Sequence, residues 1–322
     1  MSKTVLVTGG AGFIGSHLTE RLAHRGDRVL IVDNFDSYYP RAFKEENLRA
    51  ASTAGRVAFA EADVRDYTRL RELFGRAKAD AVVHLAARPG VRPSFETPHV
   101  YLDINVRGTL NVLMACREFG VPKMLFASSS SVYGSLDEPA DEERTPCRPL
   151  SPYGASKVAG EALCSAAAGE LAVTALRFFT VYGPRQRPDM AIARFSKLIA
   201  LGEPVTLFGD GSSSRDYTYI SDTITGIVAA LDADLPGYNV INFGRGKPLS
   251  LRDLVRLIEL GLDVPATIRF EPDQPGDPQS TCADITRARR LLGYDPAVAP
   301  QEGVIRYSEW LLECQREFAS SR

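Results

Sequence analysis

A glycine-rich turn between an apolar segment and a helix-like segment constrains the fold of this chain more than any other feature. Residues 3–8 are apolar and β-branched and predict a strand, residues 9–15 form the turn, and residues 13–25 have helical spacing. Glycines let the backbone approach a pyrophosphate, and the N-terminus of the following helix offers free N–H groups and a partial positive charge. This order predicts a dinucleotide-binding turn with the contact residues Gly9, Gly12, Phe13, Ile14 and Gly15.

The alternation of strand-like and helix-like segments continues through the first half of the chain. Further strands are expected over residues 28–33, 57–61, 81–85, 123–127 and 172–178, and helices over residues 67–77, 100–119 and 153–169. Nearly continuous apolar strands that alternate with helices indicate a parallel sheet covered on both faces. The second half is less regular, with short strand-like pieces at 205–208, 239–243 and 267–270. We therefore predict an α/β fold, a Rossmann-type doubly wound parallel sheet with a smaller α/β substrate-binding lobe.

Asp33 ends the second predicted strand and indicates which dinucleotide binds. An acidic group there can bind both ribose hydroxyls and repels a 2′-phosphate, and the sequence Asp33-Asn34-Phe35 contains no arginine. The cofactor is therefore expected to be NAD rather than NADP, with Asn34 beside it, unless Asp33 is a solvated loop residue. Asp63 and Val64 follow the third strand and are expected near the adenine, although Asp63 could instead cap the next helix.

Composition excludes several classes of function. The chain has 322 residues, 44% of them hydrophobic, and a net charge of −2, so we expect no general attraction to nucleic acid or to a membrane. We expect no secretory signal and no membrane span, because no apolar run approaches the roughly 20 residues that cross a bilayer. The five cysteines are scattered and have no ligand spacing with the histidines. This pattern predicts reduced thiols in the cytoplasm and no metal site.

Tyr153 and Lys157 are the strongest candidates for chemistry. They stand four residues apart at the start of a predicted helix, so their side chains share one face. An ammonium beside a phenol lowers the pKa of the phenol, which would give an acid or base that works near neutral pH. The spacing alone is also found in ordinary surface pairs, so the rest of the chain decides its meaning.

Several motifs in this order resemble those of the extended short-chain dehydrogenases/reductases, in their nucleotide-sugar epimerase/dehydratase group. The motifs are the glycine turn, His84-Leu-Ala-Ala, Asn105, residues 128–134 and Tyr153-x-x-x-Lys157. The resemblance implies that Tyr153 is the catalytic base, that Lys157 lowers its pKa and holds the nicotinamide ribose, and that Ser129 orients the sugar hydroxyl. It also implies cofactor contacts from Leu85, Ala86, Ala87 and Asn105.

The second half of the chain resembles the same group. There the likeness implies that Arg215 binds the diphosphate, that Phe208 lies near the uracil unless it is a core residue, and that Asp277 binds the nucleotide ribose. Gln274 departs from the arginine often found at that place, which leaves a phosphate contact there in doubt. We expect residues 1–180, rejoined by about 217–246, to bind NAD, and residues 181–322 to form mainly the nucleotide-sugar-binding lobe.

Oligomeric state is also suggested by the likeness. The helices predicted at residues 100–119 and 153–169 resemble those that form the group's four-helix dimer contact. Small residues on the second of them, Ala155, Ala159 and Gly160, would permit close packing. A homodimer is therefore expected.

The segment at residues 129–132 indicates the type of reaction. Dehydratases and decarboxylases of the group carry an acidic residue where this chain has Ser131, and without a general acid the remaining path is 4-epimerisation of a UDP-sugar through a 4-keto intermediate. Residues 177–191 resemble the version found in UDP-glucuronate 4-epimerases. This likeness implies that Ser130, Ser131, Thr180 and Arg187 bind the carboxylate of UDP-glucuronate on its way to UDP-galacturonate.

Other interpretations stay open. Ser130 and Ser131 could serve turn chemistry, Thr180 could be strand-end packing, and Arg187 could be a surface residue of a proline-rich loop. The main alternative function is that of a UDP-glucose 4-epimerase. By their resemblance, those enzymes carry Asn at the position where this chain has Thr180. A nucleotide-sugar dehydratase or decarboxylase and a non-catalytic NAD-binding protein are further alternatives.

Overall fold

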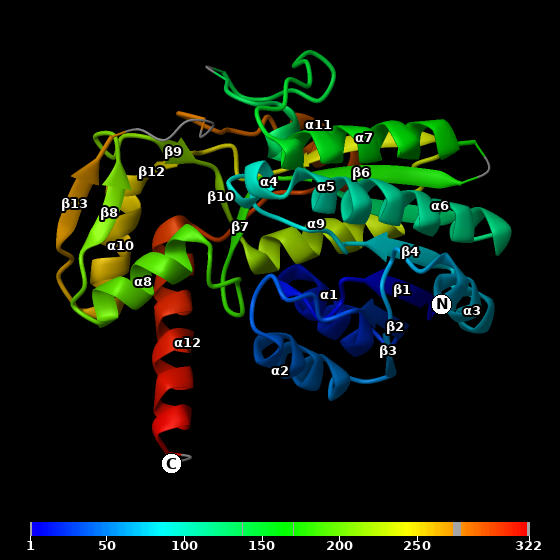
Figure 1. Ribbon diagram of the computed structural model, residues 1–322, viewed down its shortest axis with the longest axis horizontal. Helices are drawn as coiled ribbons and strands as arrows, with labels where there is room; N and C mark the ends of the chain where they lie inside the picture. The colour runs from blue at the N-terminus through cyan, green and yellow to red at the C-terminus, as the bar shows by residue number, and fades with distance from the viewer. Residues whose placement is uncertain (1, 137, 170, 273–277, 321–322) are drawn as a thin grey trace.

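A seven-stranded parallel sheet forms the centre of the computed structural model, which describes residues 2–136, 138–169, 171–272 and 278–320 (Figure 1). Its strand order is β11-β6-β5-β4-β1-β2-β3, and every neighbouring pair is parallel. The strands are β1 (Thr4–Thr8), β2 (Arg28–Asp33), β3 (Val57–Glu61), β4 (Ala81–His84), β5 (Lys123–Ser129), β6 (Ala172–Phe178) and β11 (Tyr238–Phe243).

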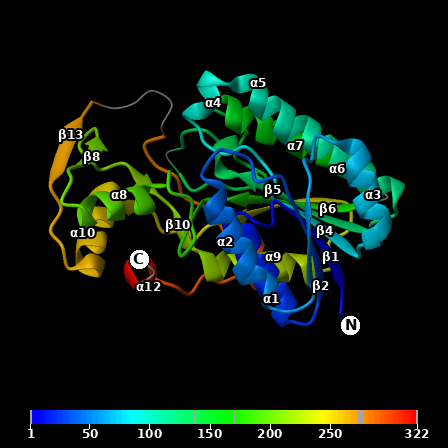
Figure 2. The same ribbon diagram turned by 60° about the horizontal axis from the view of Figure 1, so that its bottom comes forward.

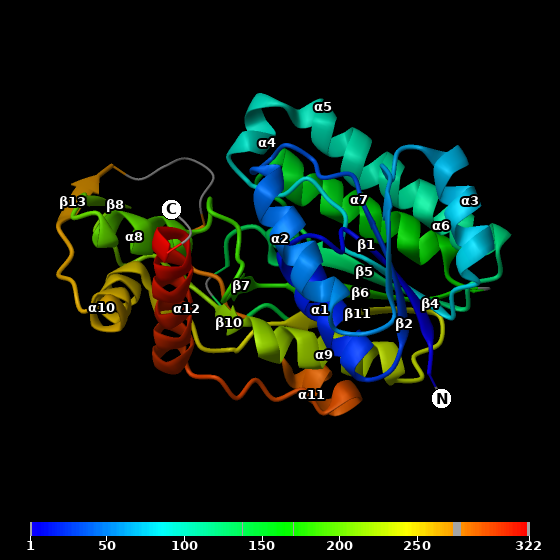
Figure 3. The same cartoon turned by 90° about the horizontal axis from the view of Figure 1, so that it is seen from below.

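Helices cover both faces of this sheet (Figure 3). One face carries α1 (Phe13–His24), α2 (Arg41–Ser52) and α9 (Ile220–Asp232), and the other carries α3 (Tyr67–Ala77), α6 (Gly108–Glu118) and α7 (Pro152–Ala167). Residues of β1 alternate between two hydrophobic cores, Val5 and Val7 on one side and Leu6 on the other. Both faces are therefore buried, which explains why the strands are apolar throughout. The predicted doubly wound sheet is confirmed.

Two helical features differ from the sequence prediction. The single helix expected over residues 100–119 is three consecutive segments, α5 (Pro98–Tyr101), the π-helix η1 (Leu102–Arg107) and α6. Asn105 lies in the π-helical part, a form found often at functional sites. Helix α2 was not predicted, because its sequence is mostly polar and buries only three residues, Lys44, Asn47 and Ala51.

A smaller lobe lies beside the open end of the sheet (Figure 2). In it, α8 (Ala191–Ala200) and α12 (Pro300–Ser320) pack against α10 (Leu251–Leu262), and β8 (Val205–Phe208) pairs in parallel with β13 (Ile268–Glu271). The remaining short elements are not all part of the lobe. Helices α4 (Pro93–Glu96) and η2 (Ser130–Val132) pack against α7, and α11 (Thr286–Leu292) packs against β11 and α9. The other short strands are β7 (Thr180–Tyr182), β9 (Ser214–Arg215), β10 (Tyr217–Tyr219) and β12 (Leu249–Ser250).

Besides α11, which packs against α9 and β11, one longer segment of the chain returns from the lobe to the sheet. Strand β11 adds to the sheet beside β6, and α9 packs on α1, so the residue 239–243 piece belongs to the large sheet. This return lies within the segment 217–246 named from the sequence, whereas the exact division into two domains stays a prediction. Among the described residues, no helix is long and apolar enough to span a bilayer, and no cluster of three or more His, Cys, Asp or Glu side chains could hold a metal ion.

Candidate active site

Two adjoining cavities lie where the carboxyl ends of the parallel strands face the lobe. The sheet order reverses at β1, between β4 and β2, which is the place where open α/β sheets bind ligands. The first cavity extends over the glycine turn, the end of β5 and the start of α7, and the second lies against β8, β9 and α8. Four residues line both cavities, namely Tyr38, Gly90, Val91 and Thr180, so the cavities are neighbours.

The glycine turn has the geometry of a dinucleotide cradle. Gly9 adopts φ +70°, and a Cβ there would lie 2.7 Å from the backbone nitrogen of Ala86. A Cβ at Gly15 would overlap the carbonyl oxygen of Gly9, so the turn tolerates no side chain at either position. All five predicted contact residues of this turn line the first cavity, as do Leu85, Ala86 and Ala87 on the opposite side. The residues present therefore fit a pyrophosphate at the N-terminus of α1.

Asp33 lies at the end of β2 and also lines the first cavity. Its Oδ2 accepts the Ala11 N–H at 3.2 Å and its Oδ1 accepts the Phe35 N–H at 2.8 Å, which fixes the carboxylate toward the cavity. Burial raises the pKa of Asp33, while the ammonium of Lys44 and these two N–H groups oppose the rise. Asp33 is buried and bound by local backbone, so it is not a solvated loop residue.

Two predicted cofactor residues do not line the cavity. The Asp63 carboxylate binds Arg65 at 2.7 Å and Asn34 at 2.8 Å, and despite its burial these hydrogen bonds lower its pKa to about 2. Asp63 is not the cap of α3 either, because that role belongs to Asp66. Asn105 bonds the backbone of Arg88 through both ends of its amide and also donates to Ser156 Oγ at 2.9 Å. Both residues support the cavity walls, while Asn34 and Val64 face the cavity itself.

Helix α7 presents Tyr153 and Lys157 to the first cavity. Ser151 begins the helix as its N-cap by accepting the Gly154 N–H at 3.1 Å, which places Tyr153 in the first turn. Lys157 Nζ donates to the carbonyl oxygen of Ala127 at 2.8 Å and lies 6.0 Å from the centre of the Tyr153 ring. The ammonium is thus held beneath the tyrosine by the end of β5.

The surroundings of Tyr153 shift its pKa. Burial raises the pKa, and a hydrogen bond with Ser129 and the charge of Arg187 partly offset that rise. Lys157 donates a hydrogen bond to the Ala127 carbonyl, and its role in lowering the pKa of Tyr153 stays a prediction. Burial also lowers the pKa of Lys157 itself to about 8, while Cys164 and Glu161 oppose the change.

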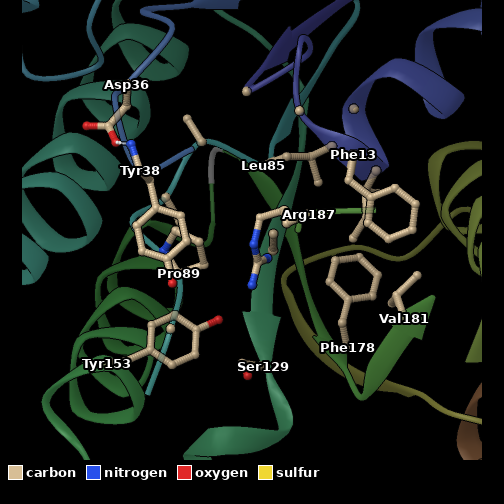
Figure 4. Close-up of a pocket in the computed structure, with 18 of the residues that line it drawn as sticks. Phe13, Asp36, Tyr38, Leu85, Pro89, Ser129, Tyr153, Phe178, Val181 and Arg187 are labelled. Atoms are coloured by element: carbon tan, nitrogen blue, oxygen red, sulfur yellow. Dashed lines mark hydrogen bonds between the residues drawn. The ribbon is translucent and has the colours of Figure 1, made fainter. Parts of the chain in front are cut away.

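The serine segment, residues 129–131, lies opposite Tyr153. Ser129 ends β5 and its Oγ accepts the Ser131 N–H at 3.1 Å, which starts the short helix η2. All three serines line the first cavity. The serine segment therefore forms a turn and also lines the cavity. Figure 4 shows Ser129 and the Tyr153 hydroxyl facing the same space.

Arg187 reaches this space from the loop that follows β7. In Figure 4 its guanidinium points between Tyr38 and Phe178 toward Ser129 and Tyr153. The guanidinium is bound by Asp189, through Nε at 3.0 Å and Nη2 at 3.2 Å. Arg187 is therefore a cavity residue rather than a simple surface arginine, and it already has a carboxylate partner. Thr180, at the start of β7, lines both cavities.

The second cavity contains the predicted diphosphate and base residues. Phe208 and Arg215 line it, and the guanidinium of Arg92 lies 4.8 Å from the centre of the Phe208 ring. Arg194, on α8, also lines this cavity. Asp277 and Gln274 lie outside the described residues.

Several cavity residues were missed from the sequence. Tyr38, Tyr39 and Lys44 come from the loop after β2 and from α2, and Arg92 and Arg194 come from α4's N-terminus and α8. The two arginines belong to no glycine or tyrosine motif, and only the fold brings them to one cavity.

Comparisons with known proteins agree with this geometry. The family described as the NAD dependent epimerase/dehydratase family matches residues 5–244. A UDP-glucuronate 4-epimerase of Thermodesulfobacterium geofontis is 39% identical over 311 residues, which cover 96% of each chain. A crystal structure of the UDP-glucuronic acid 4-epimerase of Bacillus cereus with UDP-glucuronic acid and NAD has a TM-score of 0.90 at 39% identity, covering 96% of this chain and 99% of that one.

A neutral-sugar enzyme is structurally close as well. The UDP-glucose 4-epimerase of Thermotoga maritima, solved with UDP-glucose, has a TM-score of 0.89 at 31% identity and covers 97% of this chain and 99% of that one. The chain belongs to the NAD dependent epimerase/dehydratase family. The predicted family resemblance and the NAD cofactor are thereby confirmed.

The buried ammonium of Lys157 makes stability depend on alkaline pH. Below pH 8 both the folded and the unfolded chain carry this proton, so burying the charge opposes folding. Between about pH 8 and its ordinary pKa of 10.5 the folded protein has lost the proton and the unfolded chain has not, so stability rises with pH. The difference in unfolding free energy between Lys157→Met and wild type should therefore shrink by about 3 kcal/mol across that window in urea titrations. A difference that stays constant with pH would contradict the assignment.

Proposed function

We propose that this protein catalyses the NAD-dependent 4-epimerisation of a UDP-sugar and that its substrate is UDP-glucuronate, converted to UDP-galacturonate. The observation that carries the proposal is the cavity wall opposite Tyr153, which combines the serine segment with Arg187 and contains no acidic side chain within residues 129–132. Hydroxyls and a guanidinium are donors suited to a carboxylate. The relatives named above, which act on UDP-glucuronate or bind it, support the same substrate.

The cofactor residues have defined roles in this proposal. The glycine turn would hold the pyrophosphate, Asp33 the adenosine ribose and Lys157 the nicotinamide ribose. NAD bound there would supply the acceptor for a hydride from C4 of the sugar and the donor that returns it. Because the hydride is returned, the reaction is an isomerisation and needs no second substrate.

Tyr153 moves the proton that accompanies this exchange. Its phenol oxygen takes the proton of the 4-hydroxyl and later returns it, as general-base and general-acid catalysis require. Ser129 orients the hydroxyl in this proposal, because its side chain faces the same space as the Tyr153 hydroxyl. No carboxylic acid lies in residues 129–132 to expel a 6-hydroxyl, so elimination is not supported.

Between the two proton transfers the sugar must turn within the cavity without losing carbon dioxide. A 4-keto uronate is a β-keto acid, and it loses CO₂ fast only when the bond to the carboxylate aligns with the carbonyl π system. Ser130, Ser131, Thr180 and Arg187 all line the first cavity, and in this proposal they bind the carboxylate and hold it away from that alignment.

UDP-glucose is the second candidate substrate, and one contact favours it. Arg187 is already paired with Asp189, so a neutral hexose would not leave an uncompensated guanidinium in the cavity. The structural likeness to the Thermotoga maritima enzyme supports the same alternative. The two substrates are separated by the experiment on Arg187 below.

The second cavity accommodates the UDP part. Arg215, with Arg194 and Arg92 nearby, brings positive charge to a place where a diphosphate would lie. Phe208 faces the same cavity and offers a flat surface for the uracil. Asp277 remains a proposed ribose ligand from the family likeness alone.

The protein is also proposed to form a homodimer through α6 and α7. These helices pack side by side and leave apolar side chains exposed, with Leu110 41% and Met114 44% exposed on α6. Ala155 and Ala162 of α7 are exposed beside them. Gly160 does not belong to this surface, because it is buried and a Cβ there would lie 2.5 Å from the Phe126 ring.

Charge placed on this surface should separate the dimer. Met114→Glu would bury a carboxylate against a second copy, so light scattering should give the chain mass of 35.1 kDa instead of twice that value. Leu260→Glu is the matched control, because Leu260 is 75% exposed on α10, away from α6 and α7. A wild type that is monomeric at micromolar concentration would refute the dimer.

Tyr153→Phe should abolish turnover while leaving the fold and NAD binding intact. The variant removes only the oxygen that moves the proton, and the loss should be at least about 1,000-fold in kcat. Tyr294→Phe is the control, since it removes a buried tyrosine hydroxyl, bonded to Gly244 at 3.1 Å, away from both cavities. Near-normal kcat for Tyr153→Phe would disprove the assigned role.

Arg187→Ala should damage turnover of UDP-glucuronate far more than turnover of UDP-glucose. Loss of a charge-assisted bond to the substrate carboxylate costs about 1.5–3 kcal/mol, which is roughly ten- to a hundredfold in kcat/KM. Wild type should prefer UDP-glucuronate when products are followed by NMR. An equal effect on both sugars, or a wild type that prefers UDP-glucose, would make the neutral-sugar epimerase the better assignment.

A further inference from the structure

A buried ion pair lies directly behind the reaction cavity. Glu161 is on α7, one helical turn after Lys157, and Arg177 is on β6. Arg177 donates from Nε to Oε1 at 2.9 Å and from Nη2 to Oε2 at 2.7 Å, so the pair is bidentate. The two side chains are only 5% and 8% exposed. Neither residue lines a cavity, and neither has a role in the reaction described so far.

The carboxylate of Glu161 also binds the strand that carries the serine segment. Ser128 Oγ donates to Glu161 Oε1, and Ser128 immediately precedes Ser129 at the end of β5. Glu161 therefore connects the helix of Tyr153 to the strand of Ser129. Lys157 forms a second connection between the same helix and strand, through the carbonyl of Ala127. Together these two bonds fix α7 over the last three residues of β5.

Arg177 holds the other end of the serine segment. Its guanidinium lies 4.6 Å from the centre of the Tyr133 ring, and Tyr133 directly follows η2. The Tyr133 hydroxyl donates to Asn242 Oδ1 of β11 at 2.7 Å, which anchors the ring in turn. The serine segment is thus held before its first residue by Ser128 and after its last turn by Tyr133, and both contacts lead to one ion pair.

Stability alone does not explain an ion pair at this place. Taking two charges out of water is costly, and apolar side chains of similar volume are often as stabilising as a buried ion pair. A bidentate pair with further hydrogen bonds does, however, restrict the relative position of the elements it joins. Here those elements carry Tyr153 and Ser129, whose separation decides whether a proton can pass.

We propose that Glu161, Arg177 and Ser128 are positioning residues that set Ser129 against the phenol of Tyr153. This inference rests on the proposed role of Tyr153 in proton transfer. Removing the Ser128 hydroxyl breaks one of the two bonds between the end of β5 and α7 without leaving an unpaired charge, because Glu161 keeps both bonds to Arg177. Ser129 then holds the Tyr153 hydroxyl less firmly.

A change in proton transfer should be visible in the pH profile. The charged or titratable groups that face Tyr153 are Lys157 from its own helix, Arg187 from the loop after β7, and Tyr101 from α5, whose ring centre lies 6.2 Å away. None of them is altered by the Ser128 substitution. A weaker bond from Ser129 raises the pKa of Tyr153, since that bond favours the phenolate. The acid limb of the profile of kcat/KM then moves to higher pH.

The test compares Ser128→Ala with wild type as the NAD-loaded enzyme. We expect kcat to fall about tenfold with KM for the UDP-sugar changed less than twofold, and the acid limb to move up. Arg177→Lys keeps a cation beside Glu161 but loses the planar guanidinium that forms two bonds to Glu161 and contacts Tyr133. This variant should also lower kcat and move the acid limb to higher pH. Ser196→Ala is the control, because Ser196 is a fully buried serine on α8 outside both cavities, and its Oγ has no partner within the described structure.

The outcomes separate positioning from packing. Urea unfolding first establishes that each variant is folded. A kcat within twofold of wild type, a loss without any shift of the pH profile, or an equal loss in Ser196→Ala would each overturn the proposal. The phenolate absorbance of Tyr153, measured as a difference from Tyr153→Phe, gives a readout that needs no turnover. Should wild type fail to epimerise any UDP-sugar, this titration still decides whether Ser128 affects Tyr153.

Discussion

The packing of helix α7 against the end of strand β5 is the contact on which the rest of the site depends. Lys157 donates to the Ala127 carbonyl from within the protein, and this bond places the ammonium below the cavity rather than against the tyrosine. The same helix carries Tyr153 into the space faced by Ser129. Because Lys157 is buried, its positive charge destabilises the folded state. This charge lies where the nicotinamide ribose is proposed to bind.

Charge around the cavity is arranged in pairs. Arg187 is held by Asp189, and Arg177 behind the serine segment is held by Glu161. The first pair lies at the cavity and is partly exposed, so a substrate carboxylate can compete for its guanidinium. The second is closed off from solvent and therefore acts on geometry rather than on ligands. This contrast in exposure fits the proposed roles, substrate binding for Arg187 and positioning for the pair of Glu161 with Arg177.

The local parts of this structure were predictable from the sequence and the long-range parts were not. The glycine turn, the strands of the large sheet and Asp33 follow from residue type and period, and several motifs in order, with Tyr153-x-x-x-Lys157 among them, indicated the family. The π-helical turn at Asn105 and the polar helix α2 have no such signal. The Lys157 bond to Ala127, the pairing of Glu161 with Arg177, and the meeting of Arg92 with Phe208 join residues far apart in the chain, so only the fold reveals them.

The central claim is that hydrogen leaves C4 of a UDP-sugar and returns to C4 of the same molecule on the opposite face. NMR of the enzyme with UDP-glucuronate that carries deuterium at C4 tests this claim most directly. The account predicts UDP-galacturonate with the deuterium retained at C4 and the carboxylate intact. Loss of the deuterium to water, release of CO₂ with a pentose product, or the absence of any change at C4 would contradict it.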